Sequence, residues 1–234
     1  MQIYVNAIVD AFNLLTGGNL VVWEVIRLSL VVSGSAICIA SIIGVPLGYL
    51  LGMSRFAGRG ILILLVNTAM GFPPVVIGLF VYMALSRSGP LGGLQWLFTP
   101  QGMILAQVIL AAPLVIGVSA AAIASVPRDL RLQLRALGAS RLQLGWEVLK
   151  EARGGVIVSI VAGFGAIISE VGAVSIVGGG IEGYTDVMTT AIMSNVRRGE
   201  LPQAMAWAMV LMGIALVVNA ALTTMQNVGV VYER

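Results

Sequence analysis

The chain carries few of the side chains that enzymes use. Its 234 residues include no histidine and a single lysine, Lys150. Without histidine, zinc-dependent hydrolysis through an HExxH helix and histidine-assisted nucleophilic catalysis are both excluded. Lys150 lies between Leu149 and Glu151, which excludes the GxxxxGK[ST] loop that binds nucleotide phosphates. We therefore expect no catalytic residue, no metal site and no cofactor in this chain, and no enzymatic activity of its own.

One acidic residue lies inside an apolar stretch. Glu170 falls within residues 155–177, which we expect to form a single membrane-spanning helix. An acidic side chain that faced lipid would cost roughly 2 to 3 kcal/mol, so Glu170 is expected to face protein or a cavity. Two roles are open for it: a hydrogen bond between helices, or a position on a transport path.

Glycine and hydroxyl residues follow Glu170. Gly178-Gly179-Gly180 should end the helix, and a second helical segment over residues 187–196 carries Thr189 and Thr190. Backbone amides freed by glycine, together with threonine hydroxyls, suit an oxyanion without holding it tightly. The same residues fit a plain extracytoplasmic loop, and composition alone favours the loop.

The composition places these residues in a membrane. The chain is 59% hydrophobic and only 10% charged, which is too little charge to cover a soluble globule. Residues 1–18 have apolar side chains at helical spacing and are expected to lie on the membrane surface. Five apolar stretches reach the roughly 20 residues that a span requires: about 25–53, 60–85, 102–126, 155–177 and 203–225. The expected fold is all-α, a single polytopic domain over residues 1–234 with a five-span core at 25–225.

Small residues and prolines indicate how these spans are built. Gly71-Phe72-Pro73-Pro74 should interrupt the second span, and Pro113 should interrupt the third. Two such interruptions favour a protein with moving or discontinuous helices. The first span carries a small residue at every fourth position, which predicts close packing against another helix: Ala36, Ala40, Gly44, Gly48 and Gly52.

The basic residues predict the orientation. An odd number of spans places the chain ends on opposite sides of the membrane. Nine basic residues share one side and four the other, so by the positive-inside rule the nine are cytoplasmic, the N-terminus is outside and the C-terminus is inside. Because these arginines bracket apolar spans, we expect the lipid bilayer as a partner and no nucleic acid.

Residues 127–153 form a charged loop on the cytoplasmic side. Within it lie nine of the charged residues of the chain, which total 13 basic and 10 acidic. Pro127 suits a helix N-terminus and Gly138 a helix C-terminus, near Leu137. Ser140 is placed to cap a second helix, which should direct its apolar residues toward the membrane: Leu142, Leu144, Trp146, Val148 and Leu149.

This loop resembles the EAA loop of ATP-binding cassette importer permeases. The resemblance rests on Leu137-Gly138-Ala139-Ser140, Val148-Leu149 and Ala152-Arg153-x-Gly155-Val156. It implies a coupling helix that seats in a cleft of a separate ATPase subunit. Leu132-Gln133-Leu134 replaces the family's Glu-Ala-Ala, so Asp129, one turn earlier, is the candidate substitute for the missing acid. The implied coupling residues are Asp129, Leu132, Arg135, Leu137, Gly138, Ala139 and Ser140.

Other segments resemble tungstate-uptake permeases and, less closely, molybdate and sulfate permeases. They include Asn67-Thr68-x-Met70-Gly71-x-Pro73-Pro74, Glu170-Val171-Gly172-Ala173, Val177-Gly178-Gly179 and Val187-Met188-Thr189-Thr190. The resemblance implies the type I ABC importer fold in a bacterial or archaeal cytoplasmic membrane. It also implies a homodimer around a central path, two ATPase subunits that hold ATP and Mg²⁺, and an extracytoplasmic anion-binding protein. The implied path or gate residues are Asn67, Pro73, Pro74, Glu170, Gly178, Gly179, Thr189 and Thr190.

The sequence therefore predicts the permease subunit of an ATP-driven oxyanion importer, with tungstate as cargo. A molybdate or sulfate importer of the same fold is the alternative. A secondary anion transporter is a more remote one, because that class commonly shows repeated halves and paired mid-membrane charges. Only Glu170 would meet the second criterion.

Overall fold

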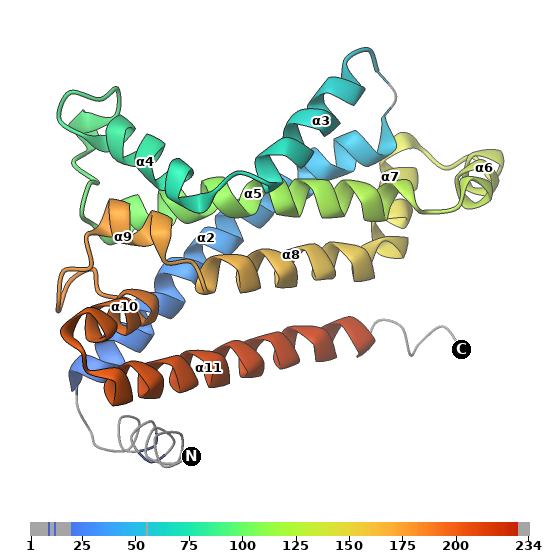
Figure 1. Ribbon diagram of the computed structural model, residues 1–234. Helices are drawn as coiled ribbons and strands as arrows, with labels where there is room; N and C mark the ends of the chain where they lie inside the picture. The colour runs from blue at the N-terminus through green and yellow to red at the C-terminus, as the bar shows by residue number, and fades with distance from the viewer. Residues whose placement is uncertain (1–8, 10–11, 13–19, 55, 229–234) are drawn as a thin grey trace.

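The computed structural model describes residues 20–54 and 56–228, together with Val9 and Phe12. Within this part of the chain every regular element is a helix (Figure 1), so the predicted all-α fold is confirmed. The surface helix expected over residues 1–18 lies outside the described residues, apart from those two isolated positions.

Among the described residues, three helical segments are long and apolar enough to cross a membrane. They are α2 (Leu20–Met53), α5 (Pro100–Ala124) and residues Leu201–Ala221 of α11 (Leu201–Val228). Two bent pairs raise the number to five when each pair is counted as one span. The first joins α3 (Arg59–Met70) to α4 (Pro74–Leu85) at 100°, and the second joins α7 (Arg141–Glu151) to α8 (Arg153–Ile168) at 62°.

The remaining helices are short and lie at or near the two ends of the bundle (Figure 1). The helix α6 (Arg128–Ala136) and the helix α7 lie at one end, beside the turn that follows α2. The opposite end holds the start of α2, the loop that leads into α5, and α10 (Met188–Arg198). The other short elements are η1 (Gly92–Leu94) and α9 (Gly172–Gly178).

The helices α2 and α5 pack at backbone distance along the predicted stripe of small residues. A Cβ atom added at Gly48 would lie 2.8 Å from the carbonyl oxygen of Ile116, and one added at Gly52 would lie 2.8 Å from that of Ala120. A Cβ added at Gly44 would lie 2.8 Å from a side-chain methyl group of Val115. Ala36 and Ala40 complete this face and are fully buried. The prediction that the stripe packs against another helix is confirmed.

Replacement of Gly48 by alanine should destabilise the protein by about 1–3 kcal/mol, because the added methyl group meets backbone atoms that cannot move aside. Gly34→Ala is the matched control on the same helix, since no atom lies within 4 Å of its added Cβ. The Tm of each variant is measured by thermal unfolding in detergent. We expect a lower Tm for Gly48→Ala and an unchanged or slightly higher Tm for Gly34→Ala, and equal Tm values would contradict the close-packing account.

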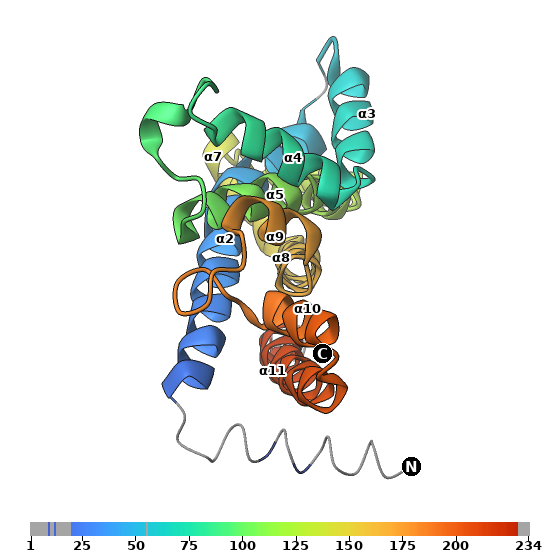
Figure 2. The same cartoon turned by 60° about the vertical axis from the view of Figure 1, so that its left-hand side comes forward.

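The two predicted interruptions have different outcomes. The second span is broken as expected: α3 ends at Met70 and α4 begins at Pro74, so the pair forms a V (Figures 1 and 2). The prediction for Pro113 is wrong, because α5 runs as one helix from Pro100 to Ala124. Proline within a membrane helix is tolerated where neighbouring helices cover the carbonyl that loses its partner. Here α2 and α8 pack against α5.

Candidate functional site

The fourth span is broken at Glu170. The predicted single helix over residues 155–177 is therefore wrong: α8 ends at Ile168 and α9 begins at Gly172. Ser169 lies at the break and its hydroxyl donates to the carbonyl oxygen of Gly165 over 2.9 Å. Such local bonds from serine and acidic side chains compete with the continuing helix.

Side chains satisfy the backbone groups that the break exposes. Gln107 on α5 donates its amide N–H to the carbonyl oxygen of Ile167 over 3.0 Å. Glu170 accepts a hydrogen bond from the backbone N–H of Ala173 over 3.1 Å and so caps the start of α9. Thr189 donates to the carbonyl oxygen of Glu170 over 3.1 Å. Irregular backbone within a membrane-spanning segment is stable only when its N–H and C=O groups find hydrogen-bond partners inside the protein.

The two broken spans meet at their second halves. A Cβ added at Gly78 of α4 would lie 2.6 Å from the Cα of Ala173 in α9. One added at Gly172 would lie 2.6 Å from Val75 and 3.3 Å from the carboxylate of Glu170. The structure therefore brings the predicted path residues Pro73 and Pro74, which begin α4, close to Glu170.

The other predicted path residues lie on α3, at the end of α9 and on α10. Asn67 is exposed on α3, one turn before the first break. Gly178 ends α9, and Gly179 follows with a φ of 77°, as the predicted glycine stop requires. Thr190 lies beside Gly180, whose added Cβ would be 3.5 Å from the Cβ of Thr190.

The threonine hydroxyls near the break are buried and engaged. Thr189 binds the backbone of Glu170, as described above. Thr190 donates to a carboxylate oxygen of Asp186 at 2.6 Å and accepts from the N–H of Val187 at 2.8 Å. Thr185 is fully buried and donates to the carbonyl oxygen of Gly178 at 2.6 Å. In this conformation these hydroxyls hold the α9–α10 loop together, and an anion would meet other groups first.

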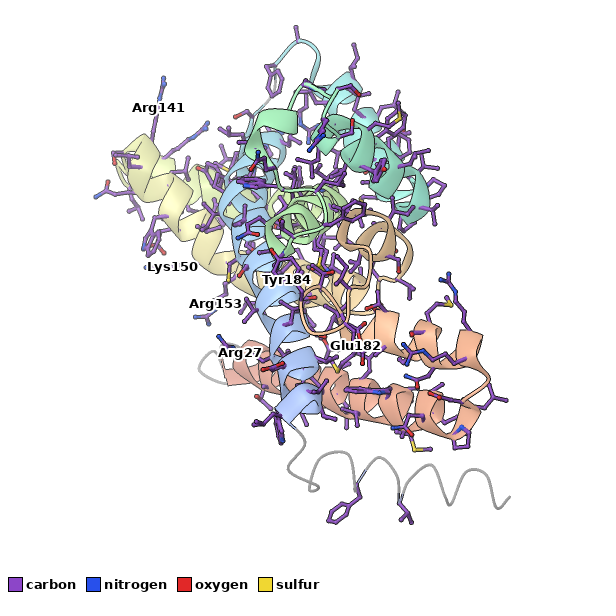
Figure 3. All side chains as sticks on the ribbon, turned by 90° about the vertical axis from the view of Figure 1, so that its left-hand side faces the viewer. Arg27, Arg141, Lys150, Arg153, Glu182 and Tyr184 are labelled. Atoms are coloured by element: carbon purple, nitrogen blue, oxygen red, sulfur yellow. The ribbon has the colours of Figure 1, made fainter. Side chains whose placement is uncertain are left out.

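This loop borders a cavity at the end of the bundle opposite α6. The cavity has a volume of about 270 Å³ and lies between the loop and the start of α2. Figure 3 looks onto this end and shows Arg27 on α2 with Glu182 and Tyr184 on the loop. Burial raises the pKa of the Asp186 carboxyl in this cavity, and the nearby Glu182 raises it further. The hydrogen bond from Thr190 and the charge of Arg198 oppose these two effects on the pKa.

Asp186→Asn should raise the Tm at neutral pH. The folded protein holds this carboxyl at a raised pKa, so its protonated form stabilises the fold at low pH, and that stability is lost as the pH rises through the raised pKa. Asparagine keeps an oxygen that accepts from Thr190 and carries no charge. In thermal unfolding across pH, the advantage of the variant should be largest at neutral pH and disappear under acid conditions. A variant that is less stable at every pH would contradict this account.

The charged loop at the other end is built by three local motifs. Pro127 precedes α6, and Gly138 follows it with a φ of 80°. The N–H of Gly138 donates to the carbonyl of Arg135 and that of Ala139 to the carbonyl of Leu134, both over 3.0 Å, which is a Schellman ending. Ser140 and Gln143 form a reciprocal capping box that starts α7. The prediction of two short helices joined by a turn at Gly138 is confirmed.

The helix α6 has an inner and an outer face. Leu130 and Leu134 pack on the buried cluster that contains Ile123 and Val126 of the α5 end. Arg131 donates from its guanidinium to the carbonyl oxygen of Ile123 and ties α6 to α5. The outer face carries three predicted coupling residues, all exposed: Asp129, Leu132 and Arg135. Of the rest, Leu137, Gly138 and Ser140 are exposed at the turn and Ala139 is half-buried.

The prediction for α7 is correct for only part of the helix. Leu144 and Val148 are buried and Leu149 packs beside them, as expected. Leu142 and Trp146 point the other way and are 88% and 60% exposed. Alternate residues lie about 200° apart on a helix, so these side chains cannot all face one surface.

Sequence reasoning missed Gln107, which is 3% exposed and supports the break at Glu170 from another helix. The signal was present in the sequence, because Gln107 is the one uncharged amide in the apolar stretch that became α5 after its first turn. It also missed Thr185, whose two hydrogen bonds close the turn after α9.

Comparison with known proteins identifies the family. Residues 44–227 match the family described as binding-protein-dependent transport system inner membrane component. The chain belongs to this family of ABC importer permeases. It is therefore a multi-pass membrane permease, and the matched region includes both broken spans and the α6–α7 loop.

Two relatives and one solved structure are similar to this chain over most of its length. The permease is 41% identical to a probable anion ABC transporter permease protein of Haloferax volcanii, over 84% of this chain and 87% of the relative. It is 37% identical to the tungstate uptake system permease protein TupB of Peptoclostridium acidaminophilum, over 93% of this chain and 95% of the relative. A bacterial ABC transporter that imports alginate shares the fold, with a TM-score of 0.74 at 20% identity over 93% of this chain and 82% of that one.

Proposed function

We propose that this permease is the transmembrane subunit of an ATP-driven tungstate importer. The assignment of tungstate as the transported anion rests on the 37% identity to a tungstate permease along nearly the whole of both chains. A molybdate or sulfate cargo is the alternative, since permeases for both are more distant relatives, at 27% and 25% identity. ATP with Mg²⁺ would bind to two separate ATPase subunits, and this chain would hold no cofactor.

The anion path would run along the V of α3 and α4. The described side chains of α3 include none that is buried, and apolar residues such as Ile61, Leu64 and Phe80 are about 64–65% exposed. A second copy of the chain would cover this surface and close the path between the two subunits. Asn67, the Pro73-Pro74 break and Glu170 would then lie nearest to the anion, while Gly178, Gly179, Thr189 and Thr190 would shape the gate behind them.

The α6 end of the bundle would face the cytoplasm. Six basic residues lie on the α6–α7 loop at this end, so the positive-inside rule favours this orientation, with the N-terminus outside and the C-terminus inside. The outer face of α6 would dock in the ATPase, with Asp129 as its acidic contact. An extracytoplasmic binding protein would deliver the anion to the opposite end.

Competition for uptake tests the cargo. The permease is expressed with its ATPase and binding protein in cells that lack their own oxyanion importers, and tungsten accumulation is measured by mass spectrometry. We expect uptake that excess molybdate lowers partly and excess sulfate hardly at all. Strong inhibition by sulfate would overturn the tungstate assignment and leave the family assignment intact.

A further inference from the structure

The carbonyl oxygen of Ile167 marks the point where the fourth span departs from a helix. In a continuous helix this oxygen would accept a hydrogen bond from the N–H of Val171, four residues further on. Here two other groups donate to it: the N–H of Glu170 over 3.2 Å and the side-chain amide of Gln107 over 3.0 Å. Because Gln107 belongs to α5, this bond holds the break from outside the broken span.

The break that Gln107 holds is short. The helix α9 begins at Gly172, and the backbone of Val171 before it is close to helical, with φ −109° and ψ −46°. Little more than Ser169 and Glu170 therefore separates α8 from a continuous helix. A carbonyl oxygen has two lone pairs, and both are engaged at Ile167. The bond from Gln107 thus favours the broken form over the joined one.

Stability alone does not explain a glutamine at this position. Gln107 is 3% exposed, and none of the described residues donates a hydrogen bond to its side-chain oxygen Oε1. The amide cannot be reversed, because its nitrogen must face the carbonyl oxygen of Ile167, which only accepts. A buried acceptor without a donor destabilises the fold. An apolar side chain of similar length would avoid this penalty.

A second buried polar contact between α5 and α8 carries no such penalty. The hydroxyl oxygens of Ser119 and Ser159 are fully buried and lie 2.9 Å apart. Ser159 also donates to the carbonyl oxygen of Val156 over 2.6 Å. This pair joins the same two helices as Gln107 does, about 18 Å further along α5, and does not touch the break. It therefore keeps α8 on α5 without any influence on the fourth span at Glu170.

We propose that Gln107 is a positioning residue for transport, which acts through Ile167 to keep the fourth span broken beside the anion path. The inference rests on the proposed path, because α9 lies against α4 where Gly78 meets the backbone of Ala173. With the break held, α9 can move with α4 while α8 stays on α5. Without Gln107, α8 and α9 would join and pull α9 away from α4. The ATPase would then turn over with little movement of anion.

Gln107→Met tests this role, because methionine has a similar length and volume and lacks the amide. The complete transporter is reconstituted, and three quantities are measured: anions accumulated per ATP hydrolysed, Tm, and hydrogen exchange of backbone amides at residues 169–172. We expect the ratio of anion to ATP to fall roughly five- to tenfold, as the loss of one hydrogen bond implies. The Tm should be unchanged or higher, and exchange at 169–172 should become slower as the helix joins.

Ser119→Ala is the matched control, since it removes a buried hydrogen bond between the same two helices. Its Tm should fall slightly, while its ratio of anion to ATP and its exchange at 169–172 should equal those of the wild type. The ratio is measured with the oxyanion that the wild type accumulates, so an error in the cargo assignment would not affect the comparison.

Two results would overturn the inference. A lower Tm and faster exchange in Gln107→Met, with a wild-type ratio of anion to ATP, would show that Gln107 only stabilises the bundle. An equal fall of the ratio in Gln107→Met and Ser119→Ala would show that transport depends on general packing of α5 on α8. Accumulation by the wild type without ATP would contradict the proposed function instead.

Discussion

Gly138→Val should abolish transport while the permease still inserts and assembles. Gly138 has a φ of 80°, and a residue with a Cβ in this left-handed conformation costs about 1–2 kcal/mol, more when it is β-branched. No atom lies within 4 Å of the added Cβ, so the effect would come from the backbone of the turn and not from a clash. The Schellman ending would open and α6 would change its angle to α7. ATP hydrolysis would then continue without accumulation of the anion.

Two variants control for this result. Gly138→Asn should retain transport, because asparagine tolerates the left-handed conformation better than other residues with a Cβ. Gly154→Ala lies at the start of α8 with no atom within 4 Å of the new Cβ and no positive φ, and it should behave as wild type. Transport and ATPase activity are measured on the same reconstituted samples. Normal transport by Gly138→Val would refute the coupling role of the turn.

Glu170→Gln should lower the maximal rate of uptake by about tenfold without loss of assembled protein. The carboxylate lies beside the start of α4, where the proposed path passes, and one charge near a partly buried anion is worth a few kcal/mol. Removal of this repulsion would hold the anion more tightly at a point that it must leave. Glutamine keeps an oxygen that can accept from the N–H of Ala173, so the cap on α9 would remain.

Glu170→Ala separates the charge from the cap. Loss of the cap should cost about 0.5–2 kcal/mol, so this variant should unfold at a lower temperature than Glu170→Gln. Uptake rates and thermal unfolding are compared for both variants at equal amounts of assembled protein. If Glu170→Gln transports at the wild-type rate and only Glu170→Ala is impaired, Glu170 is a structural cap and the path runs elsewhere.

The parts of the fold that depend on near neighbours in sequence could be predicted. The Gly138 turn and the Ser140 cap follow from bonds within five residues, and the contact of Gly44, Gly48 and Gly52 follows from helical spacing. The break at Pro73 is equally local, because proline removes a backbone donor at that position.

The break at Glu170 could not be predicted from its neighbours alone. Its exposed carbonyl groups are satisfied by Thr189 and Gln107, which are 19 and 60 residues away from the groups that they bind. Pro113 shows the converse, because α5 continues through a proline at which the sequence predicted a break, and α2 and α8 pack against this helix. The orientation of Trp146 was predictable from helical geometry, since Leu144 and Trp146 differ by about 200° around the axis.

ATP-dependent accumulation of tungstate in proteoliposomes tests the central proposal most directly. The permease is reconstituted with its ATPase and binding protein, and tungstate uptake is measured with and without ATP inside the vesicles. We expect accumulation only when ATP and the binding protein are both present, and no response to an imposed ion gradient. Accumulation driven by an ion gradient without ATP would contradict the proposal and identify a secondary transporter.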